Sequence, residues 1–100
     1  MKRYIRSAVS KLSELPYEEQ EDFARYQSTS PELLMQLVDS EFDYIRERVA
    51  KNDNASADVL RKLAENEYSD SILESIIHNP NCPEDLYYSI FNDLVERGVI

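Results

Sequence analysis

Apolar residues recur along the chain at helical spacing, and the same arrangement returns after 26 or 27 residues. Three similar windows begin at Phe23, Val49 and Ile76, which are 26 (23 to 49) and 27 (49 to 76) residues apart. Four more apolar columns follow in register: Ala24, Ala50 and Ile77; Leu33, Val59 and Leu86; Leu34, Leu60 and Tyr87; Leu37, Leu63 and Ile90. Spacings of three and four put such residues on one helical face. A recurring unit of this kind is typical of helical repeat proteins.

Each unit predicts two helices. One type opens near Pro31 and Pro83, where the missing N–H of proline is harmless. Its first turn carries an acidic residue, which suits the positive end of the helix dipole: Glu32, Asp58 and Asp85. The second type covers roughly residues 41–50 and 69–77, with a degenerate counterpart at 16–25.

The predicted helix ends depend on few residues, because Gly98 is the only glycine. We expect Asn52 and Asn79, which follow the second helix type, to adopt the left-handed conformation that often ends a helix. We expect the last helix to run from about Pro83 to Arg97 and to end at Gly98. The scarcity of glycine argues against tight β-hairpins.

The repeats predict a single domain with caps at both ends, as solenoids require. The domain covers residues 1–100. Its N-terminal cap covers residues 1–22, the repeats cover 23–91, and the C-terminal cap covers 92–100. Ala8, Val9 and Leu12 form the apolar side of a fragment of an earlier unit. One inserted residue near Glu67 to Asp70 explains the longer second step.

Several of these positions also carry a family resemblance. They are Leu37-Val38-Asp39, Ile45-Arg46, Val49-Ala50-Lys51-Asn52, and the run Asn79-Pro80-Asn81-Cys82-Pro83-Glu84 followed by Leu86. This order resembles the leucine-rich repeat variant family over about residues 23–91. Asp53 stands where that family has proline, residues 71–73 blur its valine–arginine pair, and no threonine precedes Pro83. The resemblance implies an all-α fold, a short right-handed α-solenoid of α and short α or 3-10 helices with about two to three repeats, HEAT- or armadillo-like in general appearance. It implies no enzymatic activity.

The charge balance narrows the class of partner. The net charge is −9, and no Lys or Arg occurs between Lys62 and Arg97. The only basic cluster is Lys2, Arg3 and Arg6. Proteins that bind nucleic acid directly carry a basic patch, so we expect no direct binding to nucleic acid or to an anionic membrane. The acidic stretch between Lys62 and Arg97 has two interpretations: a surface that keeps the protein soluble, or a surface that docks on a basic partner.

Targeting signals are not predicted. No stretch approaches the about 18 apolar residues of a membrane span, and the start of the chain lacks the apolar core of a secretory signal. Cys82 is the only cysteine, so no internal disulfide forms. We therefore expect a cytoplasmic protein.

Residues that could carry chemistry fall in structural positions of the repeat. His78 shares the polar column of Arg25 and Lys51, and we expect it at the surface. Cys82 shares the small-residue corner of Thr29 and Ala55, so we expect it to pack. One Cys and one His cannot supply a zinc site. We expect clusters of acidic residues, such as the one at 18–22, to form solvent-exposed helix faces. We predict no catalytic residue, no metal site, no cofactor and no enzyme activity.

Tyrosine is the most frequent aromatic residue and accounts for seven of the ten aromatic residues. Tyr44, Tyr68 and Tyr88 fall in columns that the repeat leaves polar or variable, whereas Tyr87 falls in a core column. Exposed Tyr beside acids anchors many protein interfaces, although the same residues can simply pack on neighbouring helices. The candidate partner-binding residues are Tyr44, Tyr68, Glu84, Tyr87 and Tyr88. We expect Arg46 to form an internal ion pair.

The predicted function is that of a protein–protein interaction module with an acidic, Tyr-bearing surface. Stacked repeats build extended surfaces suited to this use. The alternative is an acidic inhibitor that mimics nucleic acid in the basic groove of a nucleic-acid-binding enzyme. Either way the partner is a protein, with a basic surface in the second case, and the chain is a monomer or an end-to-end homodimer.

Overall fold

The computed structural model describes residues 11–65 and 67–100, and over these ranges the chain contains helices and no strand. A short 3-10 helix, η2 (Leu12–Glu14), precedes six α-helices: α1 (Tyr17–Arg25), α2 (Pro31–Met35), α3 (Asp43–Lys51), α4 (Ala57–Ala64), α5 (Asp70–His78) and α6 (Glu84–Glu96). The predicted all-helical class is confirmed, and the predicted helices are shifted by at most two residues at their starts. Ala8, Val9 and the basic cluster Lys2, Arg3 and Arg6 lie outside the described residues.

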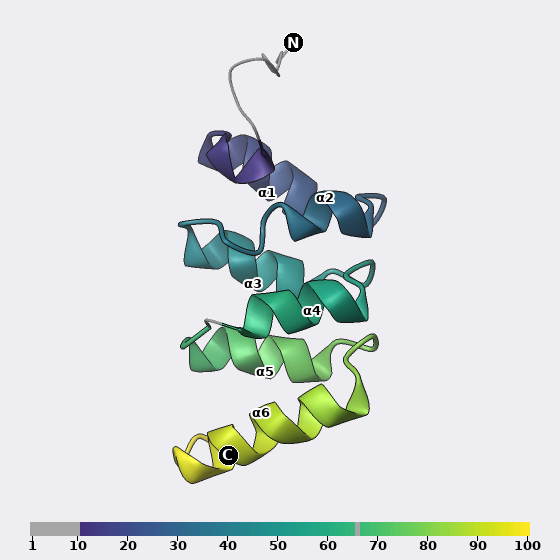
Figure 1. The fold of residues 1–100 in the computed structure, drawn as a ribbon. Helices are drawn as coiled ribbons and strands as arrows, with labels where there is room; N and C mark the ends of the chain where they lie inside the picture. Colours follow the sequence, from purple (N-terminus) through teal and green to yellow (C-terminus); the bar gives the residue numbers. More distant parts are fainter. Residues whose placement is uncertain (1–10, 66) are drawn as a thin grey trace.

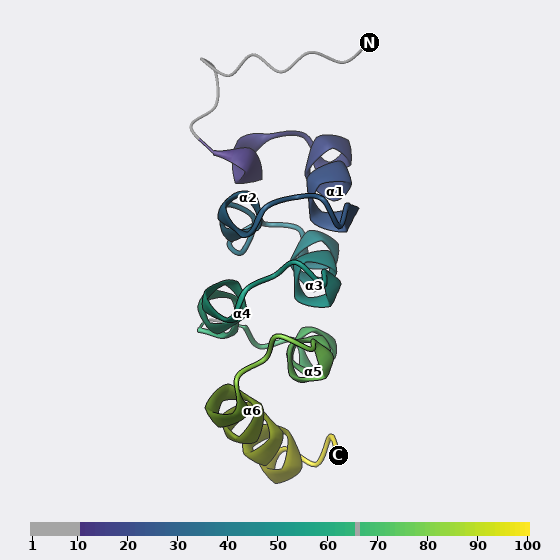
Figure 2. The same cartoon turned by 90° about the vertical axis from the view of Figure 1, so that its right-hand side faces the viewer.

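The helices stack in two rows along the long axis of a molecule that measures 46 × 21 × 19 Å (Figure 1). In the first row α1 packs against α3, and α3 packs against α5; in the second row α2 packs against α4. Figure 2 shows α6 starting in the row of α2 and α4 and slanting toward the row of α5. Arg97 then pairs with Asp70 of α5 at 2.9 Å, so α6 closes this end of the stack.

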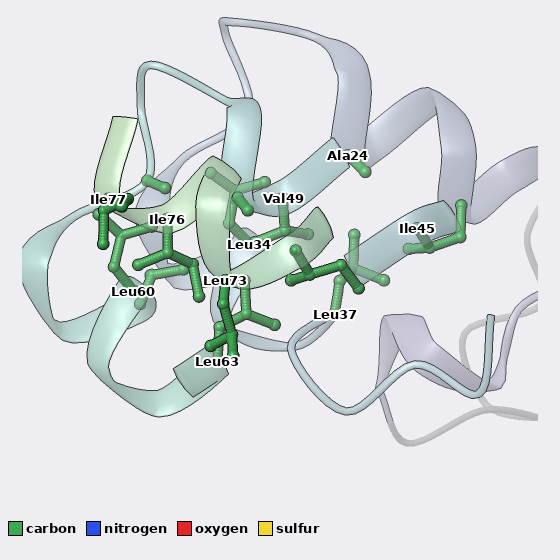
Figure 3. Close-up of a cluster of buried hydrophobic side chains, with 14 of the residues drawn as sticks. Ala24, Leu34, Leu37, Ile45, Val49, Leu60, Leu63, Leu73, Ile76 and Ile77 are labelled. Atoms are coloured by element: carbon green, nitrogen blue, oxygen red, sulfur yellow. The ribbon is translucent and has the colours of Figure 1, made fainter. Parts of the chain in front are cut away.

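Two of the apolar repeat columns are buried alike in the first two units. Leu34 and Leu60 are each 0% exposed, and Leu37 and Leu63 are 0% and 3% exposed. The first-row helices contribute Ala24, Ile45, Val49, Ala50, Ile72 and Ile76 to the same core, several of which are drawn in Figure 3. The core therefore runs between the two rows, and each unit completes the burial of the unit before it.

Helix starts and the final helix end follow local chemistry. Ser30, Ser56 and Ser69 each accept a hydrogen bond from the N–H three residues later, as N-cap residues do. At the other end Gly98 has φ +77°, and the N–H of Val99 donates to the Leu94 carbonyl at 2.9 Å. This is the Schellman arrangement that favours glycine, so the predicted end of α6 is confirmed.

The expectation for Asn52 and Asn79 is wrong. Both have extended backbones, with φ of −77° and −74°, and among the described residues only Gly98 has a positive φ. Their side chains are buried and bond across the stack instead. Asn52 Nδ2 donates to the carbonyls of Ala24 and Tyr26, both at 2.9 Å. Asn79 Nδ2 repeats this one unit later, with Ala50 at 2.8 Å and Asn52 at 2.9 Å. The extended backbone directs each amide at carbonyls that end the preceding first-row helix, which lack an intrahelical donor.

The opposite edge holds a second buried polar network. Gln20 Nε2 donates to the Leu15 carbonyl at 2.7 Å, and Ser40 Oγ donates to Gln20 Oε1 at 2.6 Å. Arg46 pairs with Glu67 at 3.0 Å and donates to the Ser40 carbonyl at 2.7 Å. The expected internal ion pair of Arg46 is confirmed, and Glu67 belongs to the segment that contains the inserted residue.

Candidate interaction surface

Aromatic and aliphatic side chains form a row along α6 at the boundary between the core and solvent. Tyr88 is 55% exposed and Val95 is 46% exposed, whereas Tyr87 and Phe91 are half-buried and pack against the core. Glu84 is exposed at the start of the same helix. The positions fall three, four and seven residues apart, so they form one continuous stripe on a helix. We call Glu84, Tyr87, Tyr88, Phe91 and Val95 the α6 stripe.

Ring packing fixes the shape of the stripe. The rings of Tyr87 and Tyr88 meet edge to face with centroids 5.3 Å apart, and those of Tyr87 and Phe91 stack at 5.9 Å. These are favourable aromatic geometries. Next to Tyr87 and Phe91 around the helix, Ile90 and Leu94 are buried against the rest of the chain. The stripe is therefore an ordered surface carried by a helix that the core holds in place.

Tyr87 is less buried than its equivalents in the repeat. It occupies the same repeat column as Leu34 and Leu60, which are fully buried, but is itself half-buried. Within the described residues α6 packs on α5, and this packing leaves Tyr88 and Val95 about half exposed.

Acidic groups surround the stripe. Asp85, Asp93 and Glu96 lie on α6 beside Glu84. The Arg61 guanidinium donates to both carboxylate oxygens of Asp85 at 2.8 Å, and this hydrogen bonding lowers the pKa of Asp85. Asp93 pairs with Arg97 at 3.0 Å.

Glu84 and Glu96 differ from their neighbours, because no ion pair of either is found among the described residues. They flank the stripe as carboxylates near its two ends.

Tyr44 belongs to a different group of aromatic side chains. Tyr17 contacts Phe42 edge to face at 5.2 Å and lies 6.3 Å from Tyr44 between centroids. Arg48 lies over the Tyr44 ring at 5.0 Å, and its Nε donates to the Tyr44 hydroxyl at 2.9 Å. Burial raises the pKa of Tyr17. Tyr44 is 38% exposed, so much of its surface is already in contact with its own chain.

Tyr68 is the most exposed large apolar side chain of the described residues, at 83%. It borders a hollow of about 390 Å³ that Asp43, Arg46, Lys62 and Glu67 also line. The basic and acidic groups of this hollow are largely paired with each other, as the contact between Arg46 and Glu67 shows.

The five predicted partner-binding residues thus separate into two groups. Glu84, Tyr87 and Tyr88 come together on the first turns of α6. Tyr44, at the start of α3, and Tyr68, just before α5, lie at the opposite edge, because first-row helices begin where second-row helices end (Figure 1). The predicted exposure of Tyr44, Tyr68 and Tyr88 is confirmed.

Phe91 and Val95 were not predicted for this surface. The signal was present in the sequence, because Phe91 and Val95 follow Tyr87 and Tyr88 at spacings of four and seven residues on the same helix.

The residues considered for chemistry lie where the repeat predicts. His78 is exposed, with Nδ1 2.7 Å from the Glu74 carbonyl oxygen. Cys82 is half-buried, and burial raises the pKa of its thiol, which keeps it protonated and weakly nucleophilic.

In residues 11–65 and 67–100, no group of three or more His, Cys, Asp or Glu side chains is arranged to hold a metal ion. None of the helices there is long and apolar enough to cross a membrane.

Comparisons with known protein families, with curated proteins and with solved structures found no match to this chain.

Proposed function

We propose that the helix pairs form a short right-handed α-solenoid of the leucine-rich repeat variant type. Three observations support this proposal. Equivalent residues such as Leu34 and Leu60 are buried alike. First-row helices pack on each other in sequence. The side-chain amides of Asn52 and Asn79 bond to equivalent carbonyls one unit earlier. A bond that repeats with the sequence period is what a stack of like units requires.

The function that this arrangement favours is non-catalytic protein binding. The observation that carries it is the α6 stripe, in which Tyr88 and Val95 are about half exposed on an ordered helix. Exposed apolar clusters rimmed by polar groups mark interaction sites, and Tyr is enriched among the residues that dominate binding energy.

An acidic mimic of nucleic acid is the competing function, and the net charge of −9 favours it. Its weakness lies in the ion pairs. Carboxylates of Asp85, Asp93 and Glu67 are each paired with an arginine of the same chain. A mimic needs unpaired carboxylates in a phosphate-like array, whereas the exposed apolar side chains of the stripe serve protein binding.

Capture of partners followed by pairwise binding separates the two functions. The full chain is immobilised and exposed to lysate of the cells that produce it, beside a resin that carries an unrelated protein of similar negative charge. Each retained protein is then purified and titrated against the chain by calorimetry, from about 0.1 to about 0.5 M salt. We expect stoichiometric binding that persists at the higher salt, because apolar burial is not screened.

Two results would contradict protein binding through apolar contact. Retention of no protein beyond the control resin would refute an interaction module. Binding that disappears at about 0.5 M salt and is displaced by duplex DNA would favour the mimic instead.

A further inference from the structure

We propose that the α6 stripe is the docking site for a basic amphipathic helix of a partner protein. This inference rests on the proposed protein-binding function and adds the location of the site and the chemistry of its occupant.

The backbone of α6 explains why the occupant is a helix. Apart from its ends, the N–H and C=O groups of Glu84–Glu96 are bonded within the helix. The stripe therefore offers side-chain packing and no edge to which an extended strand could add hydrogen bonds. A partner helix has likewise satisfied its own backbone, so packing the two together leaves no buried amide unpaired.

The spacing of the stripe fits the same occupant. Tyr88, Phe91 and Val95 repeat at intervals of three and four residues, which is the pattern of a helix–helix seam. The helix has 13 residues, and at the helical rise this gives a seam about 20 Å long. A partner helix with apolar residues at i, i+3, i+4 and i+7 presents a matching ridge.

The charges around the stripe select a basic occupant. Glu84, Asp85, Asp93 and Glu96 lie on α6, and no Lys or Arg occurs between Lys62 and Arg97. Arg97 is already shared between Asp70 and Asp93. Lys or Arg beside the apolar ridge of a partner would meet Glu84 at one end of the stripe and Glu96 at the other.

The same charges disfavour a second copy of the chain. Two copies each bring a net charge of −9 to the interface. Their α6 helices would bring Glu84 and Glu96 of one copy near the same carboxylates of the other, while Arg61 and Arg97 are already paired within each copy. Like charges in close apposition oppose association.

Designed peptides test the inference with the full chain. The probe is a fluorescent helix of about 18 residues made of Leu and Lys in amphipathic order. Comparison peptides have the same composition in scrambled order, or Glu in place of Lys. Binding is measured by fluorescence anisotropy near physiological salt. We expect the amphipathic basic peptide to bind at least about tenfold more tightly than either comparison peptide.

Variants of the chain locate the site. We expect Tyr88→Ser with Val95→Ser to weaken binding of the basic peptide by at least about tenfold, while Tyr26→Ser, at an exposed tyrosine just after α1, leaves it unchanged. Glu84→Gln with Glu96→Gln should weaken binding and flatten its salt dependence. Glu18→Gln with Glu32→Gln changes the net charge by the same amount away from α6 and should leave the salt dependence intact. Circular dichroism checks that each variant is folded.

Three outcomes would overturn the inference. The first is equal binding of the basic peptide to wild type and to the folded Tyr88→Ser, Val95→Ser variant. The second is binding of the Glu-containing peptide as tight as that of the Lys-containing one. The third is a wild-type dimer in sedimentation that the stripe variant converts to monomer, which would make a second copy the occupant.

The lysate experiment keeps the two proposals apart. If a captured protein binds the stripe variant as well as wild type, protein binding stands and only the stripe inference fails. If no protein is captured, both fail.

Discussion

At the scale of single residues, the side-chain amides of Asn52 and Asn79 connect the units of the stack. Each amide donates two hydrogen bonds to the preceding unit, and each Oδ1 accepts the N–H of the residue two positions later. The bonds to the carbonyls of Ala24, Ala50 and Asn52 are buried, where water cannot readily replace a lost bond, and the other three are partly buried. One side chain thus satisfies carbonyls that the end of a helix leaves open.

Asn79→Asp should destabilise the fold by about 2 to 3 kcal/mol, because it removes both donated hydrogen bonds and sets a carboxylate against two carbonyl oxygens. The side-chain oxygen that accepts the Asn81 N–H is kept in aspartate, so the substitution removes only the two hydrogen bonds that Nδ2 donates. Urea unfolding followed by circular dichroism measures it. Asn92→Asp, the same change at an exposed position of α6, should alter stability by less than about 0.5 kcal/mol. Equal stability of the two variants would mean that the Asn79 bonds contribute nothing.

Glu47 gives the fold a defined dependence on pH. Its carboxylate accepts a hydrogen bond from the Ser71 hydroxyl at 2.8 Å and pairs with Lys51 at 3.4 Å, and the Ser71 bond is the main reason that the pKa of Glu47 is lowered. A lowered pKa in the folded state means that the charged form stabilises the fold above the unfolded pKa. This stabilisation is lost as the pH falls through the lower, folded pKa.

Glu47→Gln should therefore be less stable than wild type at neutral pH, and the gap should close as the solution is acidified below about pH 4.5. Unfolding free energies from pH 7 downward measure the gap. Glu32→Gln removes the same charge at an exposed position and corrects for reduced self-repulsion. A gap between Glu47→Gln and Glu32→Gln that stays constant or widens in acid would contradict this account.

At the scale of helices and their ends, a local sequence signal stabilises the start of three helices. Ser30, Ser56 and Ser69 cap three helices by the same bond to the third residue. In α2 and α4 this cap matters most, because these helices have only 5 and 8 residues and helices this short are marginal by themselves.

Ser56→Ala should cost about 1 kcal/mol of stability, the typical loss of an N-cap bond. Ser89→Ala, on the exposed surface of α6, should be neutral or slightly stabilising because alanine favours the helix interior. Thermal unfolding of both variants measures the difference. A Ser56→Ala midpoint equal to that of Ser89→Ala would contradict the capping role.

The sequence was sufficient for features that depend on periodicity. Leu34, Leu60 and Leu63 are buried as their spacing predicts, and α6 ends at Gly98 as predicted. Leu37 is also buried, but it lies in the turn after α2 and not in the helix that its spacing predicts. The period also assigned His78 and Cys82 to structural positions.

Features that depend on contacts between distant residues could not be predicted. The bonds of Asn52 and Asn79 join residues 26 to 29 positions apart, and such bonds leave no local pattern in one sequence. The buried contact between Gln20 and Ser40 is of the same kind. The separation of Tyr44 and Tyr68 from Tyr87 and Tyr88 depends on the alternating direction of the helices.

At the scale of the whole molecule, the stack is closed at one end by the helix that carries the α6 stripe. α6 contacts α5 through its core side and through the Arg97–Asp70 pair. The stripe adjoins this core side, with Tyr88 and Val95 exposed beyond Tyr87 and Phe91. The same helix therefore completes the core and presents the surface proposed to bind a partner, and the two roles use neighbouring side chains of one element.

This division of roles predicts how stability and binding respond to substitution. Leu94→Ala, on the core side, should cost about 2 to 5 kcal/mol of stability. Tyr88→Ser should change stability by less than about 1 kcal/mol and weaken partner binding. Urea unfolding and calorimetric titration of both variants measure the two quantities. Loss of binding for Leu94→Ala alone, with Tyr88→Ser unaffected, would place the interface elsewhere.

The central claim, that α6 binds a protein partner, is tested most directly by amide hydrogen exchange of the chain with and without a captured and purified partner. The account predicts that exchange slows over Glu84–Glu96 in the complex and is unchanged over α2. Exchange that slows elsewhere and leaves α6 unchanged would contradict it.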